Sequence, residues 1–274
     1  MKRRVSMSRH LLRLLAAAFL ISMVGLPLAV IVATTFAKGP AAVLEVLTSR
    51  IALAALWLTV WTAAIVTVVN AVFGTLTAWV LTRYRFRGRA LLGATIDLPF
   101  AIPTVVTGLM LVALYGPDQL LGALFARAGV RVLFAPLGII VALLFVTFPL
   151  VVRAVEPVLA EIDADQEEAA FTLGAWPLAT FWRVVMPAIA PAILTGALLT
   201  FARALGEFGS VVVIAGNLPR RTLTAPVYVF GAIESGEPQA ASAMSAILVL
   251  LSLALMWAVD RFHLARLRRL GSAG

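Results

Sequence analysis

The sequence predicts an all-α, polytopic integral membrane protein with about six transmembrane helices. Its 274 residues are 62% apolar and 13% charged, whereas a soluble domain is usually about 45–50% apolar and about 25% charged. Six apolar runs are each long enough to cross a bilayer, and the basic residues gather on alternate sides of them. No stretch is long and polar enough to fold separately, so residues 1–274 are expected to form a single transmembrane domain.

Each expected span holds about 20 mostly apolar residues, because a helix rises about 1.5 Å per residue. The spans are residues 11–36, 51–81, 91–115, 133–152, 188–214 and 241–259. The first follows a basic N-terminus but is longer than the core of a secretory signal, so an uncleaved anchor is expected. The third is interrupted by Asp97, Pro99 and Pro103, which a membrane helix tolerates where its neighbours satisfy the freed carbonyls. Two external connections, 116–132 and 215–240, can hold short surface helices.

The distribution of basic residues predicts that both termini are cytoplasmic. One side carries Lys2, Arg3, Arg4, Arg9, Arg13, Arg83, Arg85, Arg87, Arg89, Arg153, Arg183, Arg261, Arg266, Arg268 and Arg269, and the other carries Lys38, Arg50, Arg127, Arg131, Arg220 and Arg221. Loops rich in Lys and Arg stay inside. The net charge of +9 therefore belongs to this asymmetry and to anionic lipid headgroups. It does not indicate nucleic-acid binding, because no basic soluble domain with interleaved aromatic residues accompanies it.

Several kinds of chemistry are disfavoured by the residue content. The chain has no Cys, which excludes disulfides and thiolate metal sites. Its two histidines, His10 and His263, lie near terminal arginines and fit solvated helix ends better than metal ligands. A P-loop needs a lysine in a glycine-rich run, and neither Lys2 nor Lys38 lies in one. The chain is therefore not expected to be an enzyme or to bind a cofactor itself.

Two spans carry unusual polar residues. In the second, Thr59, Thr62, Thr67, Asn70, Gly74 and Thr77 form one stripe of the helix, which is either a close helix–helix seam or the wall of a polar pathway. The fifth contains Arg203 and Glu207, four residues apart, with Ser210 on the same side. A charge in a membrane must pair or face water. Arg203 and Glu207 either lock this helix into the bundle or form a charged gate in a translocation pathway.

The longest internal connection, residues 156–187, is unexpectedly acidic for a basic membrane protein. It contains Glu156, Glu161, Asp163, Asp165, Glu167 and Glu168. Anionic lipid would repel these groups, whereas a soluble partner with basic groups would attract them. Its pattern predicts a helix, a break at Gly174, and a second amphipathic helix that ends at Pro187.

The spacing in this connection is similar to the EAA loop of ABC-type importer permeases. Glu168, Ala169 and Ala170 are followed by Gly174 and then by Val184, Met186 and Pro187. Three further segments, 98–108, 146–157 and 203–217, resemble the T-type permease subunit of sulfate/thiosulfate importers, and the likeness covers nearly the whole chain. The family often has Ile or Leu where this chain has Val184 and Met186, so the apolar character is kept.

The resemblance implies a type I ABC importer permease, with a MetI-like bundle and a cytoplasmic coupling helix. Its implied partners are a second homologous permease subunit, two ATP-binding subunits and an external sulfate-binding protein. ATP would be used by the partner subunits, and transport would proceed by alternating access. Molybdate or tungstate is an alternative substrate, because sulfate and molybdate are both tetrahedral dianions. An ion-coupled secondary transporter is less favoured, since no repeated halves with broken helices are visible.

Overall fold

The computed structural model describes residues 2–37, 39–162 and 164–271, and the regular elements in these ranges are helical. Five helices are long and apolar enough to cross a membrane, or six if the bent pair α5–α6 is one span. The expected all-α fold with about six spans is confirmed. The side chains of residues 1–10 and 262–274, and residues Lys38 and Asp163, lie outside the described residues. Most of the basic residues that were counted at the two termini are among these residues.

The centre of the bundle consists of α4 (Arg50–Arg83), α8 (Pro136–Glu161) and α11 (Met186–Leu205). Two glycines allow these helices to approach closely on both sides of the buried residue Val151. A Cβ atom added at Gly74 of α4 would lie 2.8 Å from Val151 Cβ, and one at Gly196 of α11 would lie 2.8 Å from Val151 Cα. Such distances are too short for any larger residue, so α8 is held tightly between its two neighbours.

Part of the polar stripe of α4 lies in helix–helix seams. Asn70 is 1% exposed and donates a 2.8 Å hydrogen bond to Thr147 Oγ1 of α8. Thr59 Oγ1, also buried, accepts a 2.8 Å hydrogen bond from the backbone N–H of Ala225 at the start of α13 (Ala225–Glu234). Buried polar groups with partners of this kind hold helices in register.

The third expected span, 91–115, is not one straight helix. It consists of α5 (Arg89–Ala101) and α6 (Thr104–Tyr115), and the chain bends by 113° between them. Ile102 is extended (φ −85°, ψ 126°), the conformation that a following proline favours, and Pro103 begins the next turn. Proline is tolerated here by breaking the helix instead of by a small kink.

The fifth expected span, 188–214, also differs in both of its boundaries. The helix begins earlier, with α10 (Pro177–Thr180) and the π-turn η2 (Phe181–Val185), and continues through α11. Pro187 therefore does not end a helix, because the wide turn before it, in which Met186 N–H bonds to Phe181 O, accommodates the proline ring. The helix ends at Leu205, and a short separate helix, α12 (Gly209–Ile214), follows.

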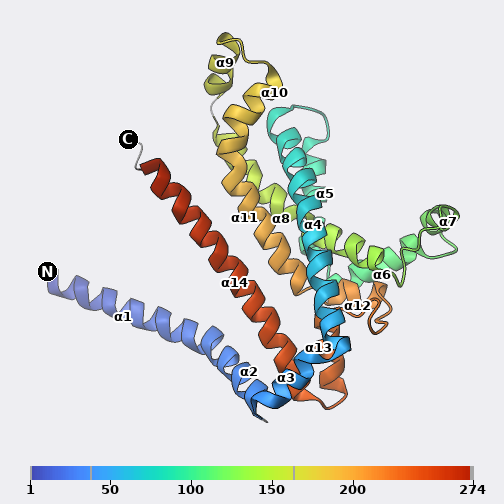
Figure 1. Ribbon diagram of the computed structural model, residues 1–274. Coiled ribbons are helices and arrows are strands. Elements are labelled where there is room, and N and C mark those ends of the chain that lie inside the picture. Colours follow the sequence, from blue (N-terminus) through green and yellow to red (C-terminus); the bar gives the residue numbers. More distant parts are fainter. Residues whose placement is uncertain (1, 38, 163, 272–274) are drawn as a thin grey trace.

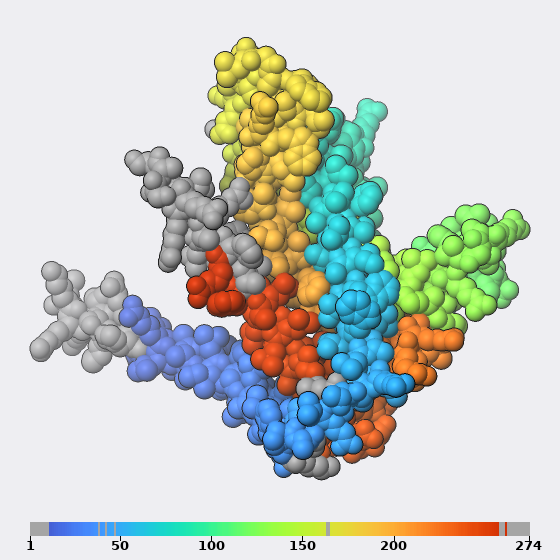
Figure 2. All heavy atoms as spheres, in the orientation of Figure 1, coloured from blue at the N-terminus to red at the C-terminus, as the bar shows by residue number. Residues whose placement is uncertain are grey.

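The first span stands apart from the central helices and packs on the last span, which also contacts α11 and α13. The first consists of α1 (Lys2–Leu20), the π-turn η1 (Ile21–Gly25) and α2 (Leu26–Phe36), and the last is α14 (Pro238–Gly271). The first span extends away from the rest of the molecule (Figure 2), and none of its most apolar window is buried within the chain. A surface of this kind is stable only against lipid or another membrane helix.

The remaining helices lie at the ends of the bundle or, in the case of α7 (Leu120–Arg127), to its side (Figure 1). The expected surface helices of the external connections are α7 and α13, and a further one is α3 (Pro40–Thr48). α3 and α13 lie at the opposite end from α9 (Ala164–Thr172) and α10, and the turn between α4 and α5 shares the α9 end (Figure 1). The C-terminal ends of α4 and α8 both lie at this same end. The chain must therefore cross back once before α8 begins, and α5–α6 serves as that one crossing. α8 continues to Glu161, so Arg153 lies within a helix and not in the loop.

Candidate functional site

The loop at the α9 end has the helix–break–helix structure that the sequence predicts. α9 carries Glu168 and Ala169 on its exposed side, whereas Ala170 is half-buried. Gly174 has φ +83°, and an added Cβ would meet no atom within 4 Å. The requirement for glycine is therefore conformational, since only glycine adopts this left-handed turn without strain. The turn reverses the chain from α9 into α10.

Exposed apolar side chains surround this turn and form what we name the coupling surface. Its members are Phe171, Leu173, Trp176, Leu178 and Trp182. Leu173 is 88% exposed and Trp176 63% exposed, at an end of the bundle beyond the central spans. Several exposed large apolar side chains next to acidic groups such as Glu168 are typical of a protein-binding surface.

Arg203, Glu207 and Ser210 are brought together, but not on one continuous helix. Arg203 is in the last turn of α11, Glu207 lies in the break after it, and Ser210 is in the first turn of α12. Glu207 Oε2 pairs with Arg203 Nη1 at 2.6 Å. Glu207 Oε1 accepts bonds from the backbone N–H of Ser210 at 2.9 Å and from its hydroxyl at 2.8 Å.

The two charges of this pair have very different surroundings. The Glu207 side chain is 1% exposed, whereas the Arg203 side chain is 40% exposed. Glu207 is thus a fully bonded anchor that fixes the break between α11 and α12, and Arg203 extends from it toward an open face. The guanidinium of Arg203 can act as a fixed positive charge, because its partner, the Glu207 carboxylate, is held by three hydrogen-bond donors, Arg203 included.

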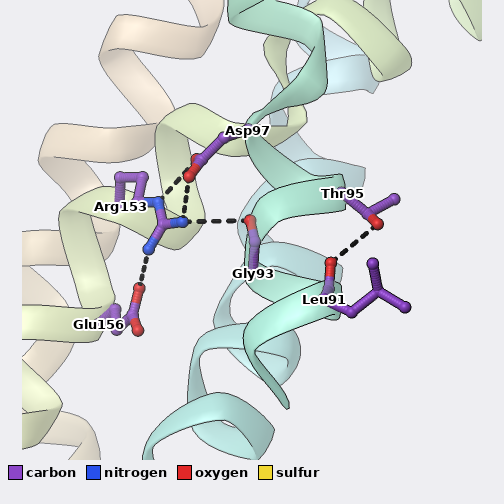
Figure 3. Close-up of polar contacts among 6 residues, drawn as sticks. All are labelled: Leu91, Gly93, Thr95, Asp97, Arg153 and Glu156. Atoms are coloured by element: carbon purple, nitrogen blue, oxygen red, sulfur yellow. Dashed lines mark hydrogen bonds and ion pairs between the residues drawn. The ribbon is translucent and has the colours of Figure 1, made fainter. Parts of the chain in front are cut away.

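A second charged cluster, which the sequence analysis did not identify, joins α5 to α8 (Figure 3). Arg153 of α8 donates to both carboxylate oxygens of Asp97, with Nε to Oδ1 at 2.8 Å, and also bonds to the carbonyl oxygen of Gly93 at 3.2 Å. Its Nη1 bonds to Glu156 Oε2 at 2.6 Å. Asp97 and Glu156 point at the same guanidinium from two helices. Only the Arg153–Glu156 spacing of three residues could have been noticed in the sequence.

The close contact between α6 and α12 connects the broken third span to the Glu207 region. A Cβ added at Gly209 would lie 2.1 Å from Thr104 Oγ1, and one at Gly108 would lie 2.8 Å from Ser210 O. The backbones of the two helices therefore approach each other closely.

Among the described residues, no group of three or more His, Asp or Glu side chains is arranged to hold a metal ion.

Comparison with known families settles the class of protein. The family described as binding-protein-dependent transport system inner membrane component matches residues 70–269. The chain belongs to this family. The predicted resemblance to importer permeases is therefore confirmed, and the chain is an ABC importer permease of the inner membrane.

The permease has relatives over most of its length. It is 44% identical, over 79% of this chain and 76% of the relative, to the probable sulfate transport system permease protein cysT of Chlorokybus atmophyticus. It is 41% identical, over 86% of this chain and 85% of the relative, to the sulfate transport system permease protein CysT of Salmonella typhimurium.

Solved structures share the fold at low sequence identity. One is a bacterial alginate ABC transporter in complex with an alginate pentasaccharide-bound periplasmic protein, with a TM-score of 0.77, 14% identity, and coverage of 95% of this chain and 94% of that one. Another is the MetNI methionine ABC transporter in an inward-facing conformation, with a TM-score of 0.56, 20% identity, and coverage of 76% and 96%. These likenesses support the MetI-like bundle.

Proposed function

We propose that this permease carries sulfate or thiosulfate into the cell, with energy from ATP hydrolysed by a separate subunit. The observation that carries the proposal is the 41–44% identity to sulfate transport permeases over more than three quarters of the chain. The exposed coupling surface at one end of the bundle supports it, because this permease contains no P-loop and needs a partner that binds ATP.

Uptake of radiolabelled sulfate in a strain that lacks this gene tests the substrate. We expect the wild-type gene to restore uptake, and excess thiosulfate to compete. If molybdate competes better than thiosulfate, the substrate is molybdate or tungstate. Uptake that persists after ATP depletion but collapses with the ion gradient would instead indicate a secondary transporter.

We propose further that two ATP-binding subunits dock at the EAA loop, and that a second homologous permease and an external sulfate-binding protein complete the importer. Glu168 and the coupling surface face away from the bundle and fit a groove with apolar and basic groups. Glu168→Lys should insert normally but co-purify with less ATPase, since stranding a charge at an interface costs about 2–5 kcal/mol. Glu45→Lys, the same change at an exposed position of α3 at the opposite end of the bundle, is the matched control. Unchanged co-purification and uptake in Glu168→Lys would contradict the docking site.

The orientation completes the proposal, with both termini and α9 in the cytoplasm. The basic asymmetry of the sequence supports it, as does the shared end of α9 and the α4–α5 turn. Because the chain has no Cys, single cysteines at the exposed positions Ala37, Ala128 and Ser235, and at Gly271, can be tested for labelling from outside the cell. Labelling is expected at the first three positions and not at Gly271. The reverse pattern would invert the topology and remove the ATPase from α9.

We also propose that Arg203 faces the path of the anion, with Glu207 and Ser210 holding it in place. The supporting observation is the exposure of Arg203 above an anchored carboxylate. A dianion that crosses the bilayer gains from a fixed positive charge on its way.

A further inference from the structure

The last turn of α4 contacts the EAA loop both before and after Gly174. Arg83, the last residue of α4, forms an ion pair with Glu167 in the first turn of α9. Its guanidinium also lies over the ring of Trp79, 5.5 Å from the centroid. Trp79 in turn meets Phe181 of η2 edge-on, with ring centroids 5.3 Å apart. One turn of α4 thus touches the loop before Gly174 through Glu167 and after it through Phe181.

The two neighbouring glutamates of α9 point in different directions. Glu168 is exposed, whereas the side chain of Glu167 is 19% exposed and that of Arg83 is 22% exposed. Within the described ranges, the Arg83–Glu167 pair is the one side-chain ion pair or hydrogen bond that α9 makes to another helix. Both charges also suit their helix ends, a cation at the C-terminus of α4 and an anion at the N-terminus of α9.

We infer that Arg83 and Glu167 are positioning residues that fix the orientation of α9 on α4, so that a displacement of α9 moves the central helices. This inference rests on the proposed function of the EAA loop. Glu168 and the coupling surface would bind the ATPase, and Glu167 would transmit the movement. α4 is suited to receive it, because it packs tightly on α8 through Gly74 and is bonded to α8 through Asn70.

The test uses the assembled importer with Glu167→Gln, which keeps the shape of the side chain and removes its charge. ATPase co-purification should stay normal, since Glu168 and the coupling surface are unchanged. The ratio of sulfate transported to ATP hydrolysed should fall at least about fivefold, the lower end of common coupling effects. Spin labels at Thr172 of α9 and Leu76 of α4, both exposed, should show a broader distance distribution. Glu45→Gln, the same change at an exposed position of α3 at the opposite end of the bundle, should change neither quantity.

Charge reversal distinguishes positioning from a general need for these residues. Arg83→Glu combined with Glu167→Arg should recover most of the transport ratio and the narrow distribution. Recovery should be incomplete, because each reversed charge then opposes its helix end. If Glu167→Gln fails to reach the membrane, recovery of membrane level and coupling by the double variant supports the inference, and no recovery overturns it.

Two other results would decide against the inference. A normal ratio together with an unchanged distance distribution in Glu167→Gln would show that the pair transmits nothing. A reversal variant that remains as uncoupled as the single variant would show that pairing is not what matters. A failure of the proposed function can be told apart from these two results. In that case the wild-type permease itself would retain no ATPase, while the spin-label distances would still report the position of α9.

Discussion

The Arg203–Glu207 pair should respond asymmetrically when either charge is removed. Arg203→Met leaves a carboxylate that is 1% exposed without its counter-charge, whereas Glu207→Gln leaves a guanidinium that is already 40% exposed. Breaking a buried pair costs about 3–5 kcal/mol, and the open side of Arg203 screens part of this attraction. We therefore expect a loss of about 2–3 kcal/mol in unfolding free energy for Arg203→Met and about 1 kcal/mol for Glu207→Gln.

The double variant separates stability from transport. Arg203→Met with Glu207→Gln should recover to within about 1 kcal/mol of the wild type, because a buried ion pair can be replaced by neutral groups at little cost. The glutamine oxygen can still accept the bonds from Ser210. Sulfate uptake should nevertheless stay low, since the positive charge that faces the anion is gone. Thermal unfolding of the purified importer and uptake into proteoliposomes measure the two effects.

The refuting outcomes are distinct. Full sulfate uptake by the double variant would reject a role for Arg203 in the anion path and leave the pair as a structural element. Equal destabilisation by the two single variants would contradict the argument from burial. Arg221→Met, at an exposed position of the external connection, controls for the loss of an arginine and should leave stability and uptake near wild-type values.

Two further variants test the packing and the α5–α8 cluster. Gly209→Ala should destabilise by about 1–3 kcal/mol, because its Cβ would lie 2.1 Å from Thr104 Oγ1; Gly206→Ala, where the nearest atom is 4.0 Å away, is the matched control, and equal melting temperatures would contradict the close approach. Arg153→Met should lower the melting temperature more than Asp97→Asn does, because it strands two carboxylates while the other variant leaves Arg153 paired; the opposite order would argue against the shared guanidinium.

The sequence predicted the parts of the fold that depend on composition and local spacing. Apolar runs located the spans, and the motif around Glu168 and Gly174 located the loop, since both signals lie within a few turns of chain. The prediction was wrong in treating residues 91–115 and 188–214 as continuous helices. It missed the break at Ile102–Pro103 and the end of α11 before Glu207, although the residues that break these helices were visible in the sequence. Whether a proline kinks, breaks or merely follows a π-turn depends on what packs around it. Pro103 lies at a break, and Pro187 follows a π-turn.

Contacts between distant segments were the part that the sequence could not supply. Arg83 and Glu167 are separated by 84 positions, and Arg153 and Asp97 by 56. Each of these residues taken alone fits an ordinary loop or helix-end charge. Arg203 and Glu207 were found because they are four residues apart, and yet their different burial followed only from the structure.

The 113° bend between α5 and α6 has a consequence for how the permease enters the bilayer during synthesis. The halves contain 13 and 12 residues, about 20 and 18 Å of helix, while a hydrocarbon core is about 30 Å thick. Neither half can cross alone, and the polar backbone at the break cannot face lipid. This segment therefore depends on α8, which is made after it and supplies the Arg153 partner of Asp97. We expect the third span to be fully inserted only after α8 has been made.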